Sequence, residues 1–155
     1  MKTKASFGGG PAHPIFVHYP IALWTTSVLT DVIYYFSRHA TLVVISKFLI
    51  AAGILGAIAA AIPGLVDWTG ITQTAVKKIA TRHLVLNVLA LVLFAVSLYL
   101  RMNHYGAPLV GFHLKIPFVV SVVGWLLMVI SASLGGKLVY EHRMGVNEAP
   151  TPPGS

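Results

Sequence analysis

Long apolar stretches alternate along the chain with short segments that carry most of the polar residues. Because a helix needs about 20 mostly apolar residues to cross the core of a bilayer, each stretch predicts a transmembrane helix. Asp31 interrupts the first stretch and Lys47 the second, and each is close enough to an interface to reach water. The four predicted spans are Ile15–Phe36, Thr41–Val66, Leu84–Leu100 and Ile116–Gly136.

The connections between the predicted spans are short. Short loops join antiparallel neighbours, so we predict an all-α membrane protein with four transmembrane helices in an up-down-up-down bundle. Both chain ends then lie on one side of the membrane, the terminal side, and the opposite side is the loop side. Seven basic residues fall on the terminal side and four on the loop side, which favours cytoplasmic termini.

The chain divides into one membrane domain with a short segment at each end. Residues 1–14 form an N-terminal extension, residues 15–146 the four-helix transmembrane domain, and residues 147–155, which contain three prolines, a disordered tail. Small residues recur at every fourth position of the second span, and this ridge predicts close packing of that helix on a neighbour. Its members are Ala52, Gly56, Ala60 and Gly64.

Composition narrows the class of protein further. The chain is 56% hydrophobic and only 10% charged, whereas a soluble domain carries about 25% charged residues. The absence of cysteine excludes disulfide scaffolds and thiolate sites, including iron–sulfur clusters. A net charge of +7 raises the question of nucleic-acid binding, but the basic residues are scattered through interfaces and loops. We therefore expect the lipid bilayer, and no nucleic acid, as a partner.

Histidine is the unusual component of the composition, with seven residues against four acids. Folding the chain into its spans places four histidines on the terminal side, together with Asp67. Counted from the loop-side ends of their helices at about 1.5 Å per residue, His18 and His83 lie at nearly the same depth, just inside the terminal-side boundary. The terminal-side histidines are His13, His18, His83 and His142, and the loop-side histidines are His39, His104 and His113.

Helical periodicity indicates which residues share a face. Small and polar residues follow one stripe of the third span and one of the fourth, and such residues favour the bundle interior over lipid. We therefore expect His83 to point inward, and His18 shares a similar face with Ala22 and Thr25. The third-span stripe contains His83, Asn87, Ala90, Phe94, Ser97 and Arg101, and the fourth-span stripe contains Ser121, Gly124, Met128, Ala132 and Gly135.

Two imidazoles at one level of a membrane bundle suit the axial ligation of a b-type haem. Ionisable groups inside a membrane are costly and commonly functional, which favours a ligand role over a purely structural one. We take His18 and His83 as the favoured metal ligands, with His142 and His13 as alternates. The hypothesis at this point is one haem b on the terminal side.

Other polar residues have supporting roles in this hypothesis. Asn87 and Asp67 would orient the imidazoles by hydrogen bonds, and Arg82 and Arg143 would pair with the haem propionates. The loop-side histidines lie among turn residues, which favours solvated side chains over a second haem.

The same residues fit other classes of function. A hydrogen-bonded His–Asp–Asn network that only fixes helix packing would make the protein a structural or assembly subunit. A zinc or copper site of three or four histidines is a further alternative, although no HxxxH pair occurs. A proton or small-solute conducting bundle would use His18, Asp31 and Asp67 as relay groups. Four helices without broken segments argue against secondary transport.

Segments spread along the chain resemble one bacterial family. They cover about residues 12–147 and are similar to the predicted four-helix membrane proteins known as domain of unknown function twenty-two thirty-one. Arg143 departs from the resemblance, because a glycine is expected after the histidine of the last segment. The matching segments are His13–Leu23, Pro63–Trp68, Arg82-His83 with Asn87, and Gly135–His142 continued by Gly145-Val146.

The resemblance implies a small protein of the bacterial inner membrane. Members of the family are sometimes joined to a Rieske-type iron–sulfur domain, and this association suggests electron transfer. Our functional hypothesis is a cytochrome b-like module that passes single electrons between a quinol, or a Rieske-type or cytochrome partner, and another carrier. No substrate pocket is evident from the sequence, so we predict an electron-transfer or structural subunit rather than an enzyme. Its apolar helices would allow association with itself or with a partner.

Overall fold

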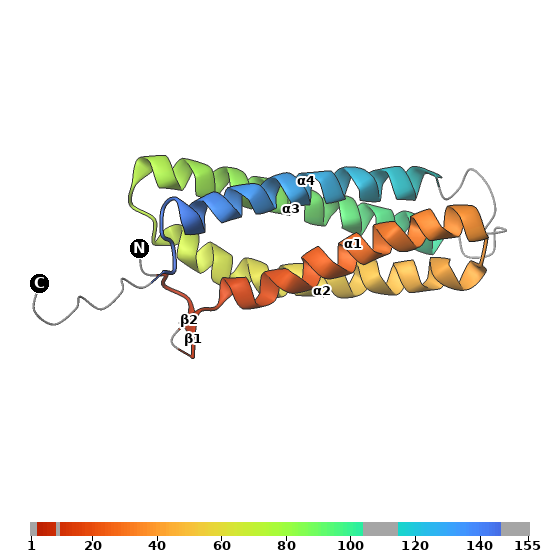
Figure 1. The fold of residues 1–155 in the computed structure, drawn as a ribbon, viewed down its shortest axis with the longest axis horizontal. Helices are drawn as coiled ribbons and strands as arrows, with labels where there is room; N and C mark the ends of the chain where they lie inside the picture. The colour runs from red at the N-terminus through yellow and green to blue at the C-terminus, as the bar shows by residue number, and fades with distance from the viewer. Residues whose placement is uncertain (1–2, 9, 104–114, 147–155) are drawn as a thin grey trace, which may run out of the picture.

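A computed structural model describes residues 3–8, 10–103 and 115–146 of the chain. Within these residues the helices are α1 (His13–Ser37), α2 (Ala40–Thr69), α3 (Thr74–Asn103) and α4 (Lys115–Tyr140). They lie side by side along the long axis of the molecule as a helical bundle (Figure 1). Two antiparallel strands of two residues each, β1 (Ser6–Phe7) and β2 (Gly10–Pro11), precede α1. The predicted tail and the loop-side residues His104 and His113 lie outside the described residues.

Three of the helices, α2, α3 and α4, are long and apolar enough to cross a membrane. This finding agrees with the second, third and fourth predicted spans. The helix α1 has 25 residues and is not among these three, and polar residues such as His18, Thr25, Thr26 and Asp31 occur within it. The helices α2 and α3 are longer than the predicted spans and extend past them toward their connection at Gly70.

The bundle consists of two closely packed hairpins, α1 with α2 and α3 with α4, which make fewer contacts with each other. Glycines of α2 explain the close approach to α1. A Cβ at Gly53 would collide with the indole of Trp24, and a Cβ at Gly56 would lie 2.7 Å from the Cβ of Tyr19. The predicted packing role of the small-residue ridge is therefore confirmed: it is the surface of α2 that receives α1.

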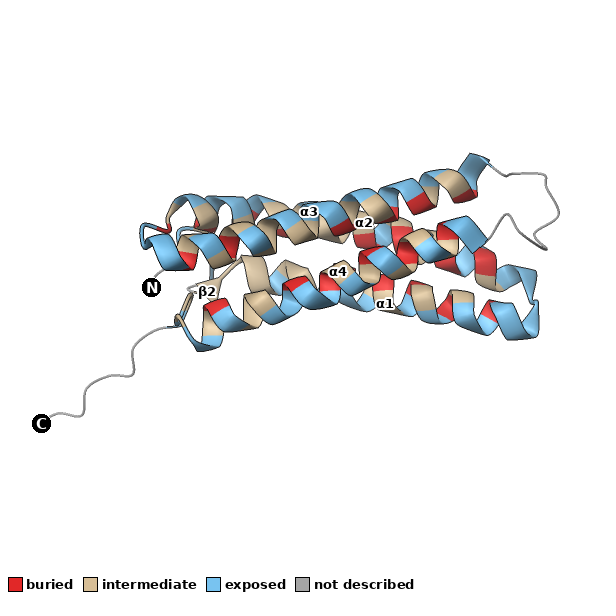
Figure 2. Cartoon of the chain, turned by 90° about the horizontal axis from the view of Figure 1, so that it is seen from above, coloured by how far each residue is buried: buried red, intermediate tan, exposed pale blue. Residues whose placement is uncertain are grey.

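The central layer of the bundle is apolar and aromatic. The rings of Trp24 and Phe94 stack with their centroids 4.2 Å apart and their planes at 12°, and Ile50, Ala90 and Met128 complete this buried cluster. Large apolar side chains also cover the outside, and Figure 2 shows the buried residues confined to the inward faces of the helices. A bundle with apolar residues on both its inside and its outside is the arrangement expected of a protein in lipid.

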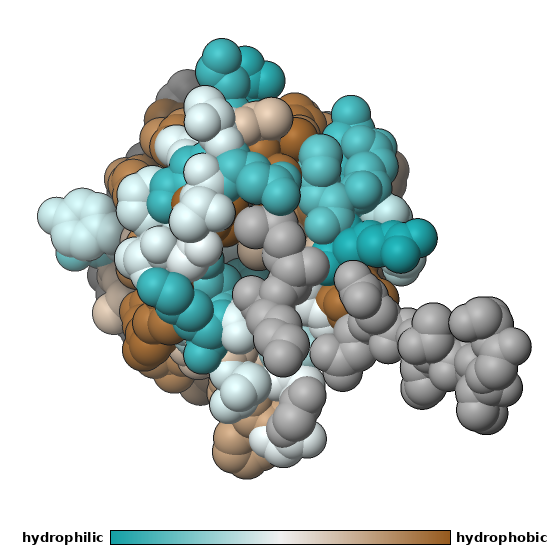
Figure 3. Space-filling view, turned by 90° about the vertical axis from the view of Figure 1, so that its left-hand side faces the viewer, coloured by the Kyte–Doolittle hydropathy of each residue, from teal (hydrophilic) through white to brown (hydrophobic). Residues whose placement is uncertain are grey.

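The first and last described residues meet at one end of the bundle, which we call the terminal end. Residues 3–8 and 10–12, the N-terminal strap, lie against this end, where Pro11 and Thr3 approach Gly145. Figure 3 views the terminal end and shows many hydrophilic residues over it, with hydrophobic residues along the flanks. The opposite end, where Ser37 and Ala40 bound the connection between α1 and α2, is the loop end.

Candidate functional site

A cavity of about 370 Å³ lies between the two hairpins in the terminal half of the bundle. All four helices and the N-terminal strap contribute to its wall, which is mostly apolar. The polar exceptions include the side chains of His13, His83, Asn87 and Asp67. An apolar cavity of this size with a few convergent polar groups is the usual form of a small-molecule or cofactor site.

His13 is the first residue of α1 and is held against α2. Its Nδ1 lies 2.7 Å from the main-chain oxygen of Ala60. Because a carbonyl oxygen only accepts, Nδ1 carries the proton and donates it, and Nε2 is left with its lone pair. Gly64 makes room for the ring, since a Cβ there would lie 2.8 Å from Nδ1.

His83 is held against α4 in the same manner. Its Nδ1 donates to the main-chain oxygen of Ser131 at 2.8 Å, and the Ser131 hydroxyl lies 3.0 Å from the same nitrogen. That hydroxyl donates in turn to the main-chain oxygen of His83 at 3.0 Å. Gly135 leaves space for the ring, because a Cβ there would lie 3.1 Å from Cε1. The helix α4 thus fixes both the tautomer and the orientation of this imidazole.

The two imidazole rings are neighbours in the wall of the cavity. Their centroids are 6.2 Å apart and their planes stand at 86°. The side-chain amide of Asn87 donates to Nε2 of His83 at 3.1 Å. Both histidines therefore have a lone pair at Nε2, and in His83 that lone pair accepts the amide proton of Asn87.

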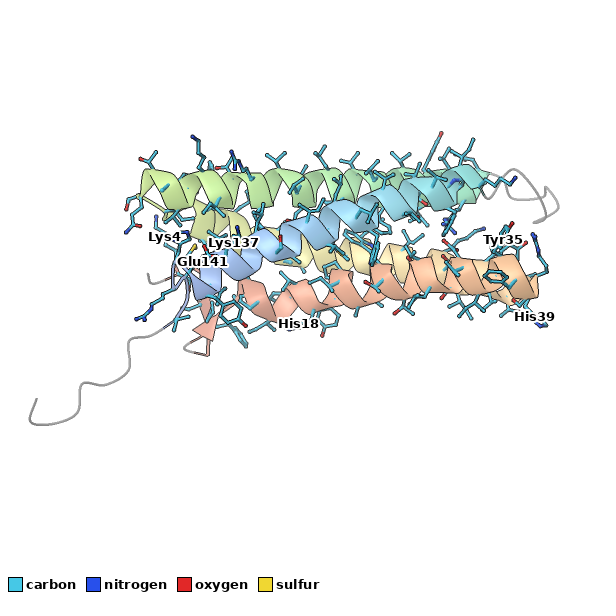
Figure 4. All side chains as sticks on the ribbon, turned by 45° about the horizontal axis from the view of Figure 1, so that its top comes forward. Lys4, His18, Tyr35, His39, Lys137 and Glu141 are labelled. Atoms are coloured by element: carbon cyan, nitrogen blue, oxygen red, sulfur yellow. The ribbon has the colours of Figure 1, made fainter. Side chains whose placement is uncertain are left out.

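The structure brings together only some of the residues that the sequence singled out. His83, Asn87 and His13 form one contact group, and Asp67 lines the same cavity. His18, the favoured partner of His83, is exposed, and Figure 4 shows it on the outer surface of the bundle. The described wall of the cavity includes the alternate His13 and not His18.

Helix phase explains the position of His18. The buried residues of α1 are Pro20, Trp24, Ser27, Thr30 and Tyr34. At about 100° per residue, His18 is turned by about 200° from Pro20 and so lies on the opposite face of the helix. The inward direction suggested by the Ala22 and Thr25 face is therefore wrong for His18.

The remaining candidates lie at the terminal end outside the imidazole pair. His142 is half-buried beyond the end of α4, and its backbone N–H donates to the main-chain oxygen of Lys137 at 3.2 Å. Arg82 and Arg143 are exposed and do not belong to the described wall of the cavity. Asp67 is buried and accepts the backbone N–H of Ala5 at 2.8 Å, so it binds the N-terminal strap rather than an imidazole.

A second polar cluster, which the sequence reasoning missed, lies toward the loop end. Arg101 forms a bidentate ion pair with Asp31, with N···O distances of 2.9 and 2.6 Å. The side chains are only 1% and 10% exposed. Nε of Arg101 donates to Ser97 at 3.1 Å, and its two terminal nitrogens also reach Ser46 and Ser121, each at 3.3 Å. These five contacts match the five N–H groups of a guanidinium and come from all four helices.

The sequence carried a signal for this cluster. An isolated acid in an apolar segment needs a cation or several donors as partners, and Arg101 shared its predicted inward stripe with Ser97. The proximity of Asp31 to an interface does not reveal this partner, which lies on another helix 70 residues away. The inward stripe itself is confirmed, because Ala90, Phe94, Ser97 and Arg101 are all buried.

The donor set limits which metal chemistry the described residues support. They contain no group of three or more His, Cys, Asp or Glu side chains placed to hold one ion. His39 is described and is exposed at the loop end, just before α2. The alternative of a zinc or copper site with three or four histidines therefore has no support in the described residues.

Comparison with known proteins identifies the family of the chain. The model of the family described as predicted membrane protein (DUF2231) matches residues 9–148. No curated protein and no solved structure matches the chain. The match covers nearly the whole sequence and agrees with the resemblance seen in its segments and with three helices apolar enough to span a bilayer. The chain therefore belongs to the DUF2231 family of predicted membrane proteins.

Proposed function

We propose that the protein is an inner-membrane electron-transfer module that binds one b-type haem between His13 and His83. It would pass single electrons between a quinol, or a Rieske-type or cytochrome partner, and another carrier. The observation that carries the proposal is the pair of imidazoles on one cavity, each with Nδ1 bound to a main-chain oxygen of a neighbouring helix. His13 thus replaces His18 as the proposed partner of His83.

His13 and His83 are the residues that would hold the haem iron, each through Nε2, the nitrogen not used by the main-chain oxygens. Their ring centroids are 6.2 Å apart, so both rings belong to the same part of the cavity. An Nδ1–H bound to a carbonyl is also the usual support of a histidine that binds metal through Nε2.

Each described residue around the pair has a specific task in this proposal. A bound haem would supply the one-electron chemistry, and the protein would hold it, orient it and keep water away. The main-chain oxygens of Ala60 and Ser131 fix the rings, and Trp24 forms part of the apolar wall of the cavity. Asn87 has to turn its amide away from Nε2 of His83 before that nitrogen binds another group.

All four helices cross the bilayer in this proposal, alternating in direction, with both termini in the cytoplasm. Tyrosine is typical of the two membrane interfaces. Exposed tyrosines lie toward both ends of the bundle, with Tyr19 and Tyr140 toward the terminal end and Tyr35 and Tyr99 toward the loop end. The polar groups of α1 also have partners inside the bundle, since Asp31 is paired with Arg101 and Ser27 donates to the Trp24 main-chain oxygen. These internal partners support α1 as a membrane span in addition to α2, α3 and α4.

A second candidate function is that of a structural or assembly subunit. The hydrogen bond from Asn87 to Nε2 of His83 favours it, because this bond completes the donor and acceptor needs of the imidazole without any ligand. In that case Asn87→Leu removes a packing bond and lowers the free energy of unfolding by about 1 kcal/mol. If the cavity holds a haem, Asn87→Leu leaves Nε2 of His83 free to bind the iron and raises haem affinity by about 2- to 10-fold.

An absorption spectrum of the purified protein, expressed with added haem, tests the proposal. We expect a Soret band with α and β bands that sharpen on dithionite reduction. His13→Ala and His83→Ala lose the six-coordinate spectrum, whereas His18→Ala, a matched change on the outer surface, keeps it. A colourless wild-type protein with iron far below one per chain overturns the haem and leaves the structural role.

The orientation is tested separately with a reporter fused to the C-terminus. A cytoplasmic reporter should be active there, as the excess of basic residues on the terminal side predicts. Activity of a periplasmic reporter at the same position contradicts this part of the proposal.

A further inference from the structure

The N-terminal strap closes the terminal end of the cavity. Its residues Thr3 and Pro11 belong to the cavity wall, next to Asp67. The backbone N–H of Ala12 donates to the main-chain oxygen of Ala5 at 3.0 Å, so the strap is folded back on itself as a short hairpin. This hairpin leads directly into His13, the first residue of α1.

Asp67 is the polar anchor of the strap on the bundle. The residue is 8% exposed, and its carboxylate accepts the Ala5 N–H at 2.8 Å, across 62 residues of sequence. A hydrogen bond to a buried carboxylate is stronger than one between neutral groups. The Lys4 side chain of the strap packs on Gly70, where a Cβ would lie 3.0 Å from it.

The anchor and the imidazole share one helix. Asp67 and the Ala60 carbonyl that binds His13 are both on α2, about two turns apart. The strap therefore ties the chain to α2 immediately before His13, while the ring of His13 is tied to the same helix by Nδ1. Loss of the Ala5–Asp67 hydrogen bond would free the backbone that carries the His13 ring and its hydrogen bond to Ala60.

We propose that Asp67, acting through the N-terminal strap, is a positioning residue for His13 and closes the cavity on its ligand. Docking of the strap brings the His13 ring opposite His83, and its release opens the terminal end of the cavity for entry of the ligand. In this proposal the ring of His83 is fixed by α4, whereas the ring of His13 takes its position only when the strap is docked. The inference rests on the proposed function only where the ligand is a haem.

The test uses readouts that need no bound haem. Amide hydrogen exchange of the N-terminal strap reports the anchor, and the low-field imidazole N–H signals of His13 and His83 report the two rings. Asp67→Ala should speed exchange at the Ala5 amide by about 10- to 100-fold and abolish the His13 signal while the His83 signal remains. Asp67→Asn keeps an acceptor oxygen and should restore most of both.

A second variant removes the donor of the same hydrogen bond, the backbone N–H of Ala5. Ala5→Pro removes the N–H that Asp67 accepts and should abolish the His13 signal as Asp67→Ala does, whereas Ala5→Gly keeps the N–H and the signal. Glu141→Ala removes an exposed acid and serves as a control for charge alone. In protein that holds haem, Asp67→Ala should also convert the six-coordinate spectrum to a five-coordinate one.

The outcomes separate the inference from the proposed function. An unchanged His13 signal in both Asp67→Ala and Ala5→Pro overturns the positioning role. Loss of both histidine signals together also overturns it, because that result reports general loosening of the bundle. The expected exchange and imidazole results in a protein that never binds haem sustain the positioning role of Asp67 and reject the haem.

Discussion

At the loop end of the bundle, Arg101 has an acceptor for each of its N–H groups, whereas at the terminal end two imidazoles line a cavity. The first cluster is closed, because Asp31 and three serines fill the space around the guanidinium. The second is open, because the rings of His13 and His83 border a cavity of about 370 Å³. Buried polar groups that are fully satisfied specify packing, and those that face a cavity are available to a ligand.

The apolar layer between the two clusters keeps them separate. Trp24 and Phe94 stack across the middle of the bundle, and the Trp24 indole N–H donates to the Ile50 main-chain oxygen at 3.3 Å. No described side-chain hydrogen bond links the Arg101 cluster to His13 or His83. A substitution in one cluster should therefore leave the hydrogen bonds of the other cluster unchanged.

The largest effect is expected at the loop end. Arg101→Met leaves the Asp31 carboxylate buried without its cation and should lower the free energy of unfolding by about 3–5 kcal/mol. Denaturation in detergent, followed by circular dichroism, measures it. The double variant Asp31→Leu with Arg101→Met removes both charges and should recover most of the loss. If Arg101→Met alone is as stable as the wild type, the closed cluster does not hold the hairpins together.

An intermediate effect is expected from Gly64→Ala at the terminal end. The new methyl group would meet the His13 ring, and the overlap costs about 1–3 kcal/mol, which exceeds the helix gain of alanine over glycine, about 1 kcal/mol. Gly136→Ala is the matched control, since a Cβ there meets nothing within 4 Å. It should stabilise the protein slightly. Thermal unfolding and the His13 imidazole signal should separate the two variants, and equal behaviour would show that Gly64 does not shape the site.

The smallest effect is expected from Ser131→Ala. The variant removes the hydroxyl that bridges the ring and the main chain of His83, at a cost of about 0.5–1.5 kcal/mol. The Ser131 carbonyl still fixes Nδ1, so ligand binding should persist. Ser133→Ala, at an exposed serine two residues further along α4, should change the unfolding free energy by less than about 0.5 kcal/mol. Complete loss of the His83 signal in Ser131→Ala would mean that the hydroxyl, and not the carbonyl, holds the ring.

The helices and the direction of His83 could be predicted because they depend on local properties of the sequence. Apolar length marked α2, α3 and α4, and the inward stripe of α3 follows from 3.6-residue periodicity. The phase of α1 could not be determined in this way, because hydroxyl side chains lie on both of its faces: Ser27 and Thr30 are buried, whereas Thr26 is exposed. Large apolar side chains likewise lie on both faces, with Trp24 buried and Ile33 exposed, so periodicity alone places His18 on the wrong face.

The partners of the polar groups depend on contacts that periodicity does not encode. His13 precedes the first predicted span, yet the space beside Gly64 lets its ring reach the Ala60 carbonyl. Asp67 was expected to bind an imidazole, but a backbone N–H of the N-terminal strap takes its carboxylate. Each of these contacts joins residues from distant parts of the sequence, and each was decided by tertiary packing.

The pairing of Asp31 with Arg101 also constrains the order in which the molecule is assembled. The two residues are 70 positions apart, so Asp31 leaves the ribosome well before its cation exists. Until α3 is made, the carboxylate of Asp31 in the α1–α2 hairpin lacks the two hydrogen bonds that Arg101 donates to it. The first hairpin therefore reaches its final contacts only after the second hairpin is synthesised. In a chain truncated before Arg101, the Asp31 carboxylate lacks the ion pair that it forms in the complete protein.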